Sequence, residues 1–264
     1  MKALITVYDE AYSLFELQLN VDIQAFILVF ELIKLSVVVN SEMEILIVGH
    51  LENLEEARQK FGRSHTYALE EGKLGQEITF TKYDVVFDFT IGHDSSAIKR
   101  YQGPSAPIVF LDVSTISLKQ LSDASTQILF FGFCGMPGFL NGEIMEVCVR
   151  HERDLNKLKE VCHELKTDYR VVADRVGLVT PRVVCMIINE AYCTVEEGTA
   201  TRDDVDLAMK LGTNYPFGPF EWGLRIGLSH VCALLDAVHR DTADERYKIC
   251  PLLRSEMRLA SGSV

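Results

Sequence analysis

Gly49 stands where a phosphate-binding loop would begin. It follows the apolar run EILIV, and the next segment, LENLEEARQKF, has the apolar spacing of a helix. A loop that binds a dinucleotide usually reads G-x-G-x-x-G, because glycines let the backbone approach the pyrophosphate at a helix N-terminus. Here Leu51 and Leu54 occupy the places of the second and third glycines. The spacing therefore gives only weak support to a dinucleotide site.

Three glutamates lie at the start of the helix predicted after Gly49. Glu52, Glu55 and Glu56 would place negative charge where phosphates bind, which disfavours a pyrophosphate. Carboxylates in a first helical turn are also ordinary partners of the helix dipole. We prefer this structural interpretation of the three side chains.

The elements around Gly49 predict an α/β fold. From about residue 44 to 172, apolar runs such as YDVVFDFT, IVFLDVS and ILFFGF alternate with short polar segments. Continuous apolar strands suit a parallel sheet that is covered on both faces. After Asp174 the spacing becomes helical, with Gly198 as a helix end and Thr201 as the first residue of a capping box with Asp204. We therefore expect an α/β domain over residues 43–172 and an all-α domain over 173–264.

Composition excludes some classes of partner. The formal charge is −12 and no basic cluster interrupts it, so we expect no nucleic-acid binding. Seven cysteines occur without a C-x-x-C pair, which indicates buried, reduced thiols in the cytoplasm. The apolar segment 23–39 carries Glu31 and Lys34 in its middle. We therefore expect no membrane span.

The stretch YPFGPFEWGLRIG, residues 215–227, is predicted to be a tight turn between two helices. Pro216 and Pro219 each fix one backbone angle and remove one donor, and Gly218 can adopt angles that side chains forbid. Its aromatic residues supply large apolar area to neighbouring helices. We expect this stretch mainly to pack helices and to shape a subunit contact.

Residues 188–228 resemble the C-terminal helical domain of 3-hydroxyacyl-CoA dehydrogenases. The motifs N-E-A, M-K-x-G and P-x-G-P-F-E stand in the family's order, carried by the residues Asn189, Glu190, Ala191, Gly198, Asp203, Asp206, Met209, Gly212, Pro216, Gly218, Pro219 and Gly227. The resemblance implies that this domain forms a homodimer interface and part of an acyl-CoA cleft. It also implies a Rossmann-like domain ahead of it, with NAD as cofactor and Gly49 as its one matching loop residue.

The same resemblance implies two catalytic residues. Ser114 matches the serine whose hydroxyl binds the substrate oxygen, and Glu146 matches the glutamate that orients a catalytic histidine. Phe133 stands at the position of that histidine, and Pro181 at that of a substrate-site asparagine. His50, directly after the first strand, is the histidine best placed to act as a replacement.

Two functions follow from this partial match. One is oxidation of a 3-hydroxyacyl-CoA to the 3-ketoacyl-CoA with NAD, with impaired activity because the phosphate loop and the histidine are replaced. The alternative is a non-catalytic family member that acts as a dimerising or acyl-CoA-binding scaffold.

The first forty-two residues match nothing in the family. Met43 stands directly before the first predicted strand. We therefore interpret residues 1–42 as an extension of uncertain status, with translation starting at Met43 as the hypothesis. An intact mass of the native protein that included residues 1–42 would rule this out.

Overall fold

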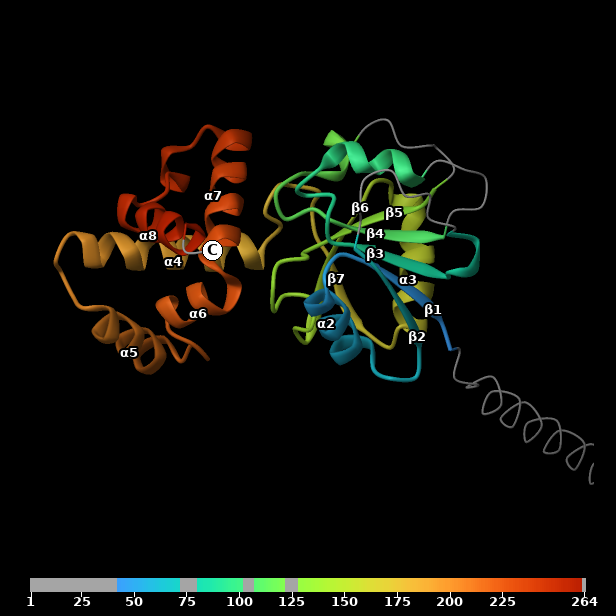
Figure 1. The fold of residues 1–264 in the computed structure, drawn as a ribbon, viewed down its shortest axis with the longest axis horizontal. Coiled ribbons are helices and arrows are strands. Elements are labelled where there is room, and N and C mark those ends of the chain that lie inside the picture. Colours follow the sequence, from blue (N-terminus) through green and yellow to red (C-terminus); the bar gives the residue numbers. More distant parts are fainter. Residues whose placement is uncertain (1–41, 72–79, 102–106, 122–127, 263–264) are drawn as a thin grey trace, which may run out of the picture. The chain divides into compact units, whose positions relative to one another are not determined.

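A seven-stranded sheet forms the first half of the protein (Figure 1). The computed structural model describes residues 42–71, 80–101, 107–121 and 128–262, so the predicted extension lies outside the described residues except for Glu42. The strand order is β2-β1-β3-β4-β5-β6-β7. The bounds are β1 Glu44–Val48, β2 Thr66–Glu70, β3 Val85–Asp88, β4 Ile108–Asp112, β5 Phe130–Phe133, β6 Ile144–Val149 and β7 Asp168–Val171.

The sheet is mostly but not entirely parallel. Strands β1 to β5 pair in parallel, β5 pairs with β6 in antiparallel fashion, and β6 pairs with β7 in parallel. The connection between β5 and β6, residues 134–143, is shorter than the dozen or so residues that a parallel crossover needs. The expectation of a parallel sheet is therefore wrong at β6, because the short connection forces the chain to return.

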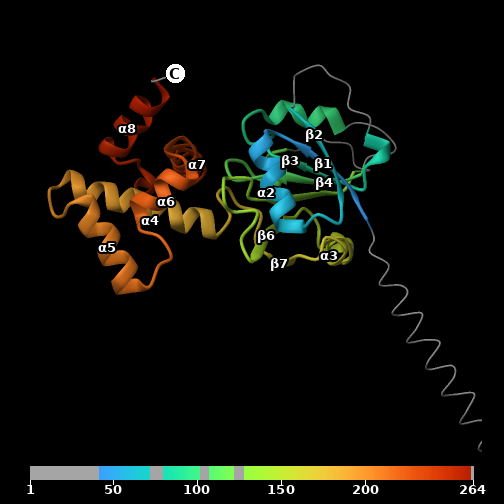
Figure 2. The ribbon, with the colours of Figure 1, turned by 60° about the horizontal axis from the view of Figure 1, so that its bottom comes forward.

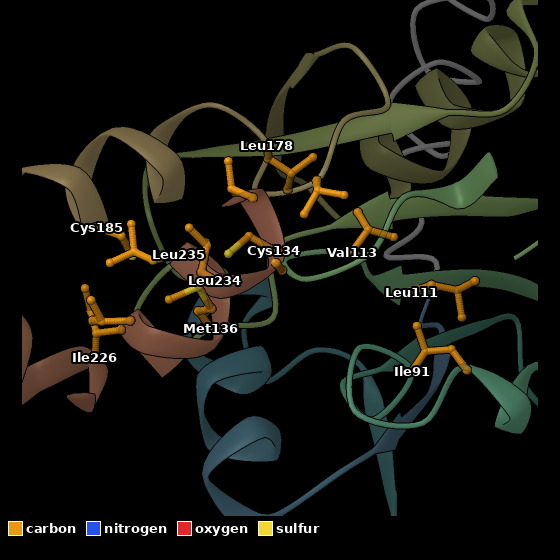
Figure 3. Close-up of a cluster of buried hydrophobic side chains, with 14 of the residues drawn as sticks. Ile91, Leu111, Val113, Cys134, Met136, Leu178, Cys185, Ile226, Leu234 and Leu235 are labelled. Carbon is orange, nitrogen blue, oxygen red and sulfur yellow. The ribbon is translucent and has the colours of Figure 1, made fainter. Parts of the chain in front are cut away.

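Buried apolar side chains cover both faces of the sheet. On one face, helices α2 (Leu51–Phe61) and α3 (Leu155–Glu164) pack over a row of phenylalanines, in which the Phe87 and Phe110 rings stack at 4.7 Å. On the other face, a second cluster joins residues of β4 and β5 to residues of the C-terminal helices. Figure 3 shows part of this cluster, with Cys134 beside Leu235. The carboxyl ends of β4 and β5 are thus packed against the helical half.

The second half is all-helical. Its helices are α4 Thr180–Glu196, α5 Arg202–Thr213, α6 Pro219–Ile226, α7 Leu228–Thr242 and α8 Pro251–Ser261. α4 is the long helix against which α6, α7 and α8 pack (Figure 2). The fold class, a Rossmann-like α/β domain followed by an all-α domain, is confirmed. The boundary between residues 172 and 173 stays a prediction.

Two helix ends match the sequence pattern. Thr201 and Asp204 form the predicted capping box at the start of α5, and Gly198 has the positive φ of 72° that suits a residue after a helix. Gly212 lies inside this helix, since α5 continues to Thr213.

The described residues form no helix that is long and apolar enough to cross a membrane. All seven cysteines are free, and all but the half-buried Cys193 are buried.

The prediction of a continuous tight turn over residues 215–227 is wrong, because α6 lies within it. Pro219 is the first residue of α6, where a missing backbone N–H costs nothing. The next two N–H groups donate to Asp206 on α5: Phe220 to Oδ1 at 2.8 Å and Glu221 to Oδ2 at 3.2 Å. A side chain at Gly218 would meet Asp206 Cγ at 2.2 Å. The glycine therefore lets Asp206 cap a helix that lies outside its own element.

We expect Asp206→Ala to lower the free energy of unfolding by about 1–2 kcal/mol, because two N–H groups of α6 lose their acceptor. Denaturant unfolding would measure the change. Asp203→Ala is the matched control, since Asp203 is an exposed aspartate one turn earlier on the same helix. Equal effects of the two substitutions would contradict the capping role.

His65 is a buried histidine held in its neutral form. Its Nδ1 accepts a hydrogen bond from the Met43 N–H at 3.2 Å, and its Nε2 is buried without a partner among the described residues. Burial lowers the pKa of His65, and the charge of Lys166 lowers this pKa further. Protonation would remove the acceptor at Nδ1 and place a charge in the interior.

We therefore predict that acid destabilises the fold through His65. The unfolded chain binds a proton below about pH 6.5 that the folded chain does not bind, so the free energy of unfolding falls as the pH drops below that value. His65→Gln, which retains an acceptor for Met43, should flatten this decline between about pH 7 and pH 5. Denaturant titrations at several pH values would measure it. Parallel curves for the two proteins would exclude His65 as the cause.

Candidate active site at the carboxyl edge of the sheet

A cavity of about 250 Å³ lies where the strand order of the sheet reverses. In the sheet, β1 lies between β2 and β3, so the chain places β2 on one side of β1 and then returns to place β3 on the other. Ligands of open α/β sheets bind at such a switch point. The cavity is lined from the ends of four strands and from two helices, by Gly49, His50, Glu52, Asn53, Phe89, Thr90, His93, Asp112, Ser114, Thr115, Gly135, Met136, Pro137, His230 and Ala233.

Ser114 lies in this cavity, bound to the last residue of β4. Asp112 Oδ1 accepts from the Ser114 hydroxyl at 2.7 Å, from the Ser114 N–H at 3.0 Å and from the Gly135 N–H at 2.9 Å. Asp112 is only 5% exposed, and this burial raises the pKa of its carboxyl, whereas the three hydrogen bonds and nearby His93 lower that pKa. The Ser114 hydroxyl thus donates its proton to Asp112, while the Ser114 oxygen can still accept a hydrogen bond.

Two histidines face the same cavity. His93 follows β3 and His230 lies in the first turn of α7, with their ring centroids 6.4 Å apart. Burial lowers the pKa of His230, and the neighbouring His93 lowers this pKa further, although Asp112 opposes both effects. Sequence reasoning missed both residues. The position of His93 just after a predicted strand was an available signal, whereas nothing near His230 in the sequence pointed to this edge.

Gly49 also lines the cavity, but the space beside it is filled. A Cβ built on Gly49 would meet Asn53 Oδ1 at 2.5 Å and Phe89 Cβ at 3.2 Å. Asn53 Oδ1 accepts the N–H of His50 at 2.8 Å, so this side chain folds back over the start of α2. Asn53 therefore occupies the corner where the bare backbone of a phosphate loop would meet its ligand.

The three glutamates near the start of α2 have different surroundings. Glu55 pairs with Arg58 at 2.8 Å, and Glu56 Oε1 accepts the N–H of Leu140 at 3.0 Å. Only Glu52 lines the cavity. Of the three, only Glu52 places negative charge at the cavity, because Glu55 and Glu56 have other partners.

The start of α2 does not fit a pyrophosphate. Leu51 is 59% exposed at the place of the second glycine, and Glu52 adds a negative charge at the cavity. With Asn53 beside Gly49, side chains crowd the helix N-terminus where a pyrophosphate would approach the backbone.

Phe133 is a core residue. It is fully buried, and its ring meets those of Phe87 and Phe89 edge-on at 5.4 and 5.1 Å. This position therefore supplies packing, and any proton transfer at this edge depends on other side chains.

Glu146 lies in a separate cleft. Its carboxylate accepts the N–H of Val179 and of Thr180, each at 2.9 Å, and also the Thr180 hydroxyl. Glu146 thus caps the N-terminus of α4. The structure does not bring Glu146 and Ser114 into one cavity, although Pro137 lines both spaces.

The cleft at Glu146 has a volume of about 560 Å³ and a mainly apolar lining. Phe217, Trp222 and Ile226 line it, and so does Pro181 from the start of α4. Arg225 adds a positive charge, with its guanidinium 4.0 Å from the centre of the Phe217 ring. Apolar walls with few polar groups are typical of small-molecule sites.

The described residues contain no group of three or more His, Cys, Asp or Glu side chains that could hold a metal ion.

Comparisons with known proteins agree with this architecture. Residues 177–260 match the family model "3-hydroxyacyl-CoA dehydrogenase, C-terminal domain". The chain is 43% identical to the 3-hydroxyadipyl-CoA dehydrogenase of Escherichia coli over 91 residues, which is 34% of this chain and 19% of that protein. It is 31% identical to a 3-hydroxybutyryl-CoA dehydrogenase of Bradyrhizobium diazoefficiens over 150 residues, 55% of this chain and 51% of that protein.

The fold extends the likeness to both halves. The crystal structure of (S)-3-hydroxybutyryl-CoA dehydrogenase PaaH1 from Ralstonia eutropha superposes with a TM-score of 0.61 at 18% identity, covering 84% of this chain and 95% of that one. The chain spans about half or less of the two curated relatives above. Residues 177–260 thus match the C-terminal domain of 3-hydroxyacyl-CoA dehydrogenases, and the chain shares the fold of the Ralstonia eutropha enzyme.

Proposed function

We propose that this protein is a 3-hydroxyacyl-CoA dehydrogenase-like oxidoreductase that binds acyl-CoA but turns it over weakly. By resemblance the reaction is oxidation of a 3-hydroxyacyl-CoA to the 3-ketoacyl-CoA with NAD. The observation that carries the proposal is the cleft at Glu146, which opens at the start of the domain that the family model matches.

The cleft suits an acyl thioester. Its apolar lining, including Phe217 and Trp222, can bury an acyl chain, while Arg225 pairs with Glu221 at 3.2 Å. The curated relatives are named as dehydrogenases of hydroxyacyl-CoA substrates. These observations support acyl-CoA as the ligand class.

Weak turnover follows from two replacements. Phe133 cannot accept a proton, and general-base catalysis typically contributes about 10²–10⁴ in rate. Asn53 and Glu52 occupy the corner where NAD would place its pyrophosphate. We infer that NAD, the cofactor implied by the family, binds poorly to the protein as it stands.

A non-catalytic scaffold is the second candidate. Leu207, Leu211 and Leu224 on α5 and α6 are 55%, 78% and 78% exposed. Exposed leucines that form one contiguous patch mark protein interfaces. They support a homodimer through the C-terminal helical domain, which could bind acyl-CoA without chemistry. The seven free cysteines support a cytoplasmic location for either function.

We predict that NADH titrated into the protein gives no binding at micromolar concentration, measured by nucleotide fluorescence. The double variant Glu52→Gln, Asn53→Gly should bind NADH at least about tenfold more tightly, because it removes one charge and clears the space beside Gly49. Glu55→Gln is the control, since Glu55 faces Arg58. Micromolar NADH affinity of the unaltered protein, with steady reduction of acetoacetyl-CoA, would refute weak turnover.

The capping role of Glu146 predicts a cost in stability. Glu146→Ala should lower the free energy of unfolding by about 1–2 kcal/mol, because two N–H groups at the start of α4 lose their acceptor. Glu143→Ala, at an exposed neighbouring position, is the control. If Glu146→Ala abolished acetoacetyl-CoA turnover at unchanged stability, Glu146 would instead be an active-site residue in the family's sense.

A further inference from the structure

We propose that His93, His230 and Asp112 form a binding site for the 3-oxygen of a 3-oxoacyl or 3-hydroxyacyl thioester, with His230 as the direct hydrogen-bonding partner. The inference rests on the proposed binding of acyl-CoA in the cleft at Glu146. It assigns the polar end of the ligand to the cavity at the carboxyl edge of the sheet. Phe133 stands where the family resemblance implies a histidine, so other imidazoles would have to contact this oxygen.

Three elements bring these side chains together. His93 comes from the segment after β3, Asp112 from the end of β4 and His230 from α7. The imidazole centroids are 6.4 Å apart, which is too far for a direct hydrogen bond between the rings and leaves room for a small group between them. Within the described part of the chain, neither imidazole has a side-chain hydrogen bond, so their nitrogens are available to a ligand.

A neutral imidazole suits both oxidation levels of the ligand. Burial and the nearby His93 lower the pKa of His230, which keeps this ring neutral at neutral pH. A neutral imidazole has one N–H donor and one nitrogen acceptor. It can therefore donate to a ketone oxygen or accept from a hydroxyl group. The Ser114 oxygen, whose proton is held by Asp112, can accept from a hydroxyl as well.

The charge of the cavity disfavours a phosphate as the ligand. Asp112 and Glu52 are the acidic groups of the lining, and its three histidines are His50, His93 and His230. No lysine or arginine among the described residues lines the cavity to balance these two carboxyl groups, so the lining disfavours an anion. The same described residues make no metal site. An uncharged ketone or hydroxyl oxygen of a ligand suits the imidazole nitrogens and the Ser114 oxygen of the cavity.

The cavity adjoins the cleft that would hold the rest of the ligand, because the two linings share a residue. Pro137 lines both spaces, and Cys134 lines the cleft while the next residue, Gly135, lines the cavity. The junction is tightly packed at Gly135, since a Cβ there would meet Asp112 Cγ at 2.8 Å. An acyl chain in the cleft can thus direct an oxygen near its thioester toward His230.

The test is a comparison of two thioesters without nucleotide. Acetoacetyl-CoA carries the 3-oxygen and butyryl-CoA lacks it. We expect isothermal titration of the full chain to give about tenfold tighter binding of acetoacetyl-CoA, the effect of one well-placed hydrogen bond. The imidazole NMR signals of His93 and His230 should move with acetoacetyl-CoA and stay in place with butyryl-CoA.

Variants separate this site from a general effect on folding. His230→Phe should reduce the affinity for acetoacetyl-CoA to that for butyryl-CoA and leave butyryl-CoA binding unchanged, whereas His230→Gln should restore part of the difference. His163→Phe, at an exposed position on α3, is the matched control. Equal binding of the two thioesters with unmoved imidazole signals would overturn the site and leave acyl-CoA binding intact. Failure of both thioesters to bind would overturn the proposed function, and this site with it.

Discussion

The buried carboxylate of Asp112 holds the functional edge of the sheet together. It accepts three hydrogen bonds at one oxygen, two from Ser114 and one from Gly135, and so joins the end of β4 to the end of β5. A carboxylate that is only 5% exposed would be costly without these donors. The positions of Ser114, of the residues after β5 and of the cavity between them all depend on this one group.

The helical half contributes side chains to both the cleft and the cavity. Its first helix begins at a cap provided by Glu146 of β6, and α7 directs His230 at the carboxyl edge. The cleft and the cavity are thus built by both halves, with Pro137 between them. The cleft at Glu146 is the site proposed for an acyl thioester, while the corner at Gly49 is occupied by the side chain of Asn53.

Local patterns predicted much of the fold, and distant contacts account for the rest. The apolar runs and the capping box at Thr201 depend on neighbours in sequence, and both were found from spacing alone. Helix α6 was missed because its N–H groups are capped by Asp206, which lies on another helix. The two imidazoles of the cavity, at 93 and 230, come together only through the packing of α7 at the edge of the sheet. Glu146, which the resemblance implies to orient a histidine, caps α4 from the first half of β6, and its catalytic role stays a prediction.

The most direct test of this account is a crystal structure obtained with both NAD and acetoacetyl-CoA in the drop. The account predicts density for the thioester in the cleft at Glu146, with its 3-oxygen between the imidazoles of His93 and His230, and no dinucleotide at the start of α2. A dinucleotide lying across Gly49, with Asn53 turned away and the cavity histidines out of contact with the acyl group, would contradict it.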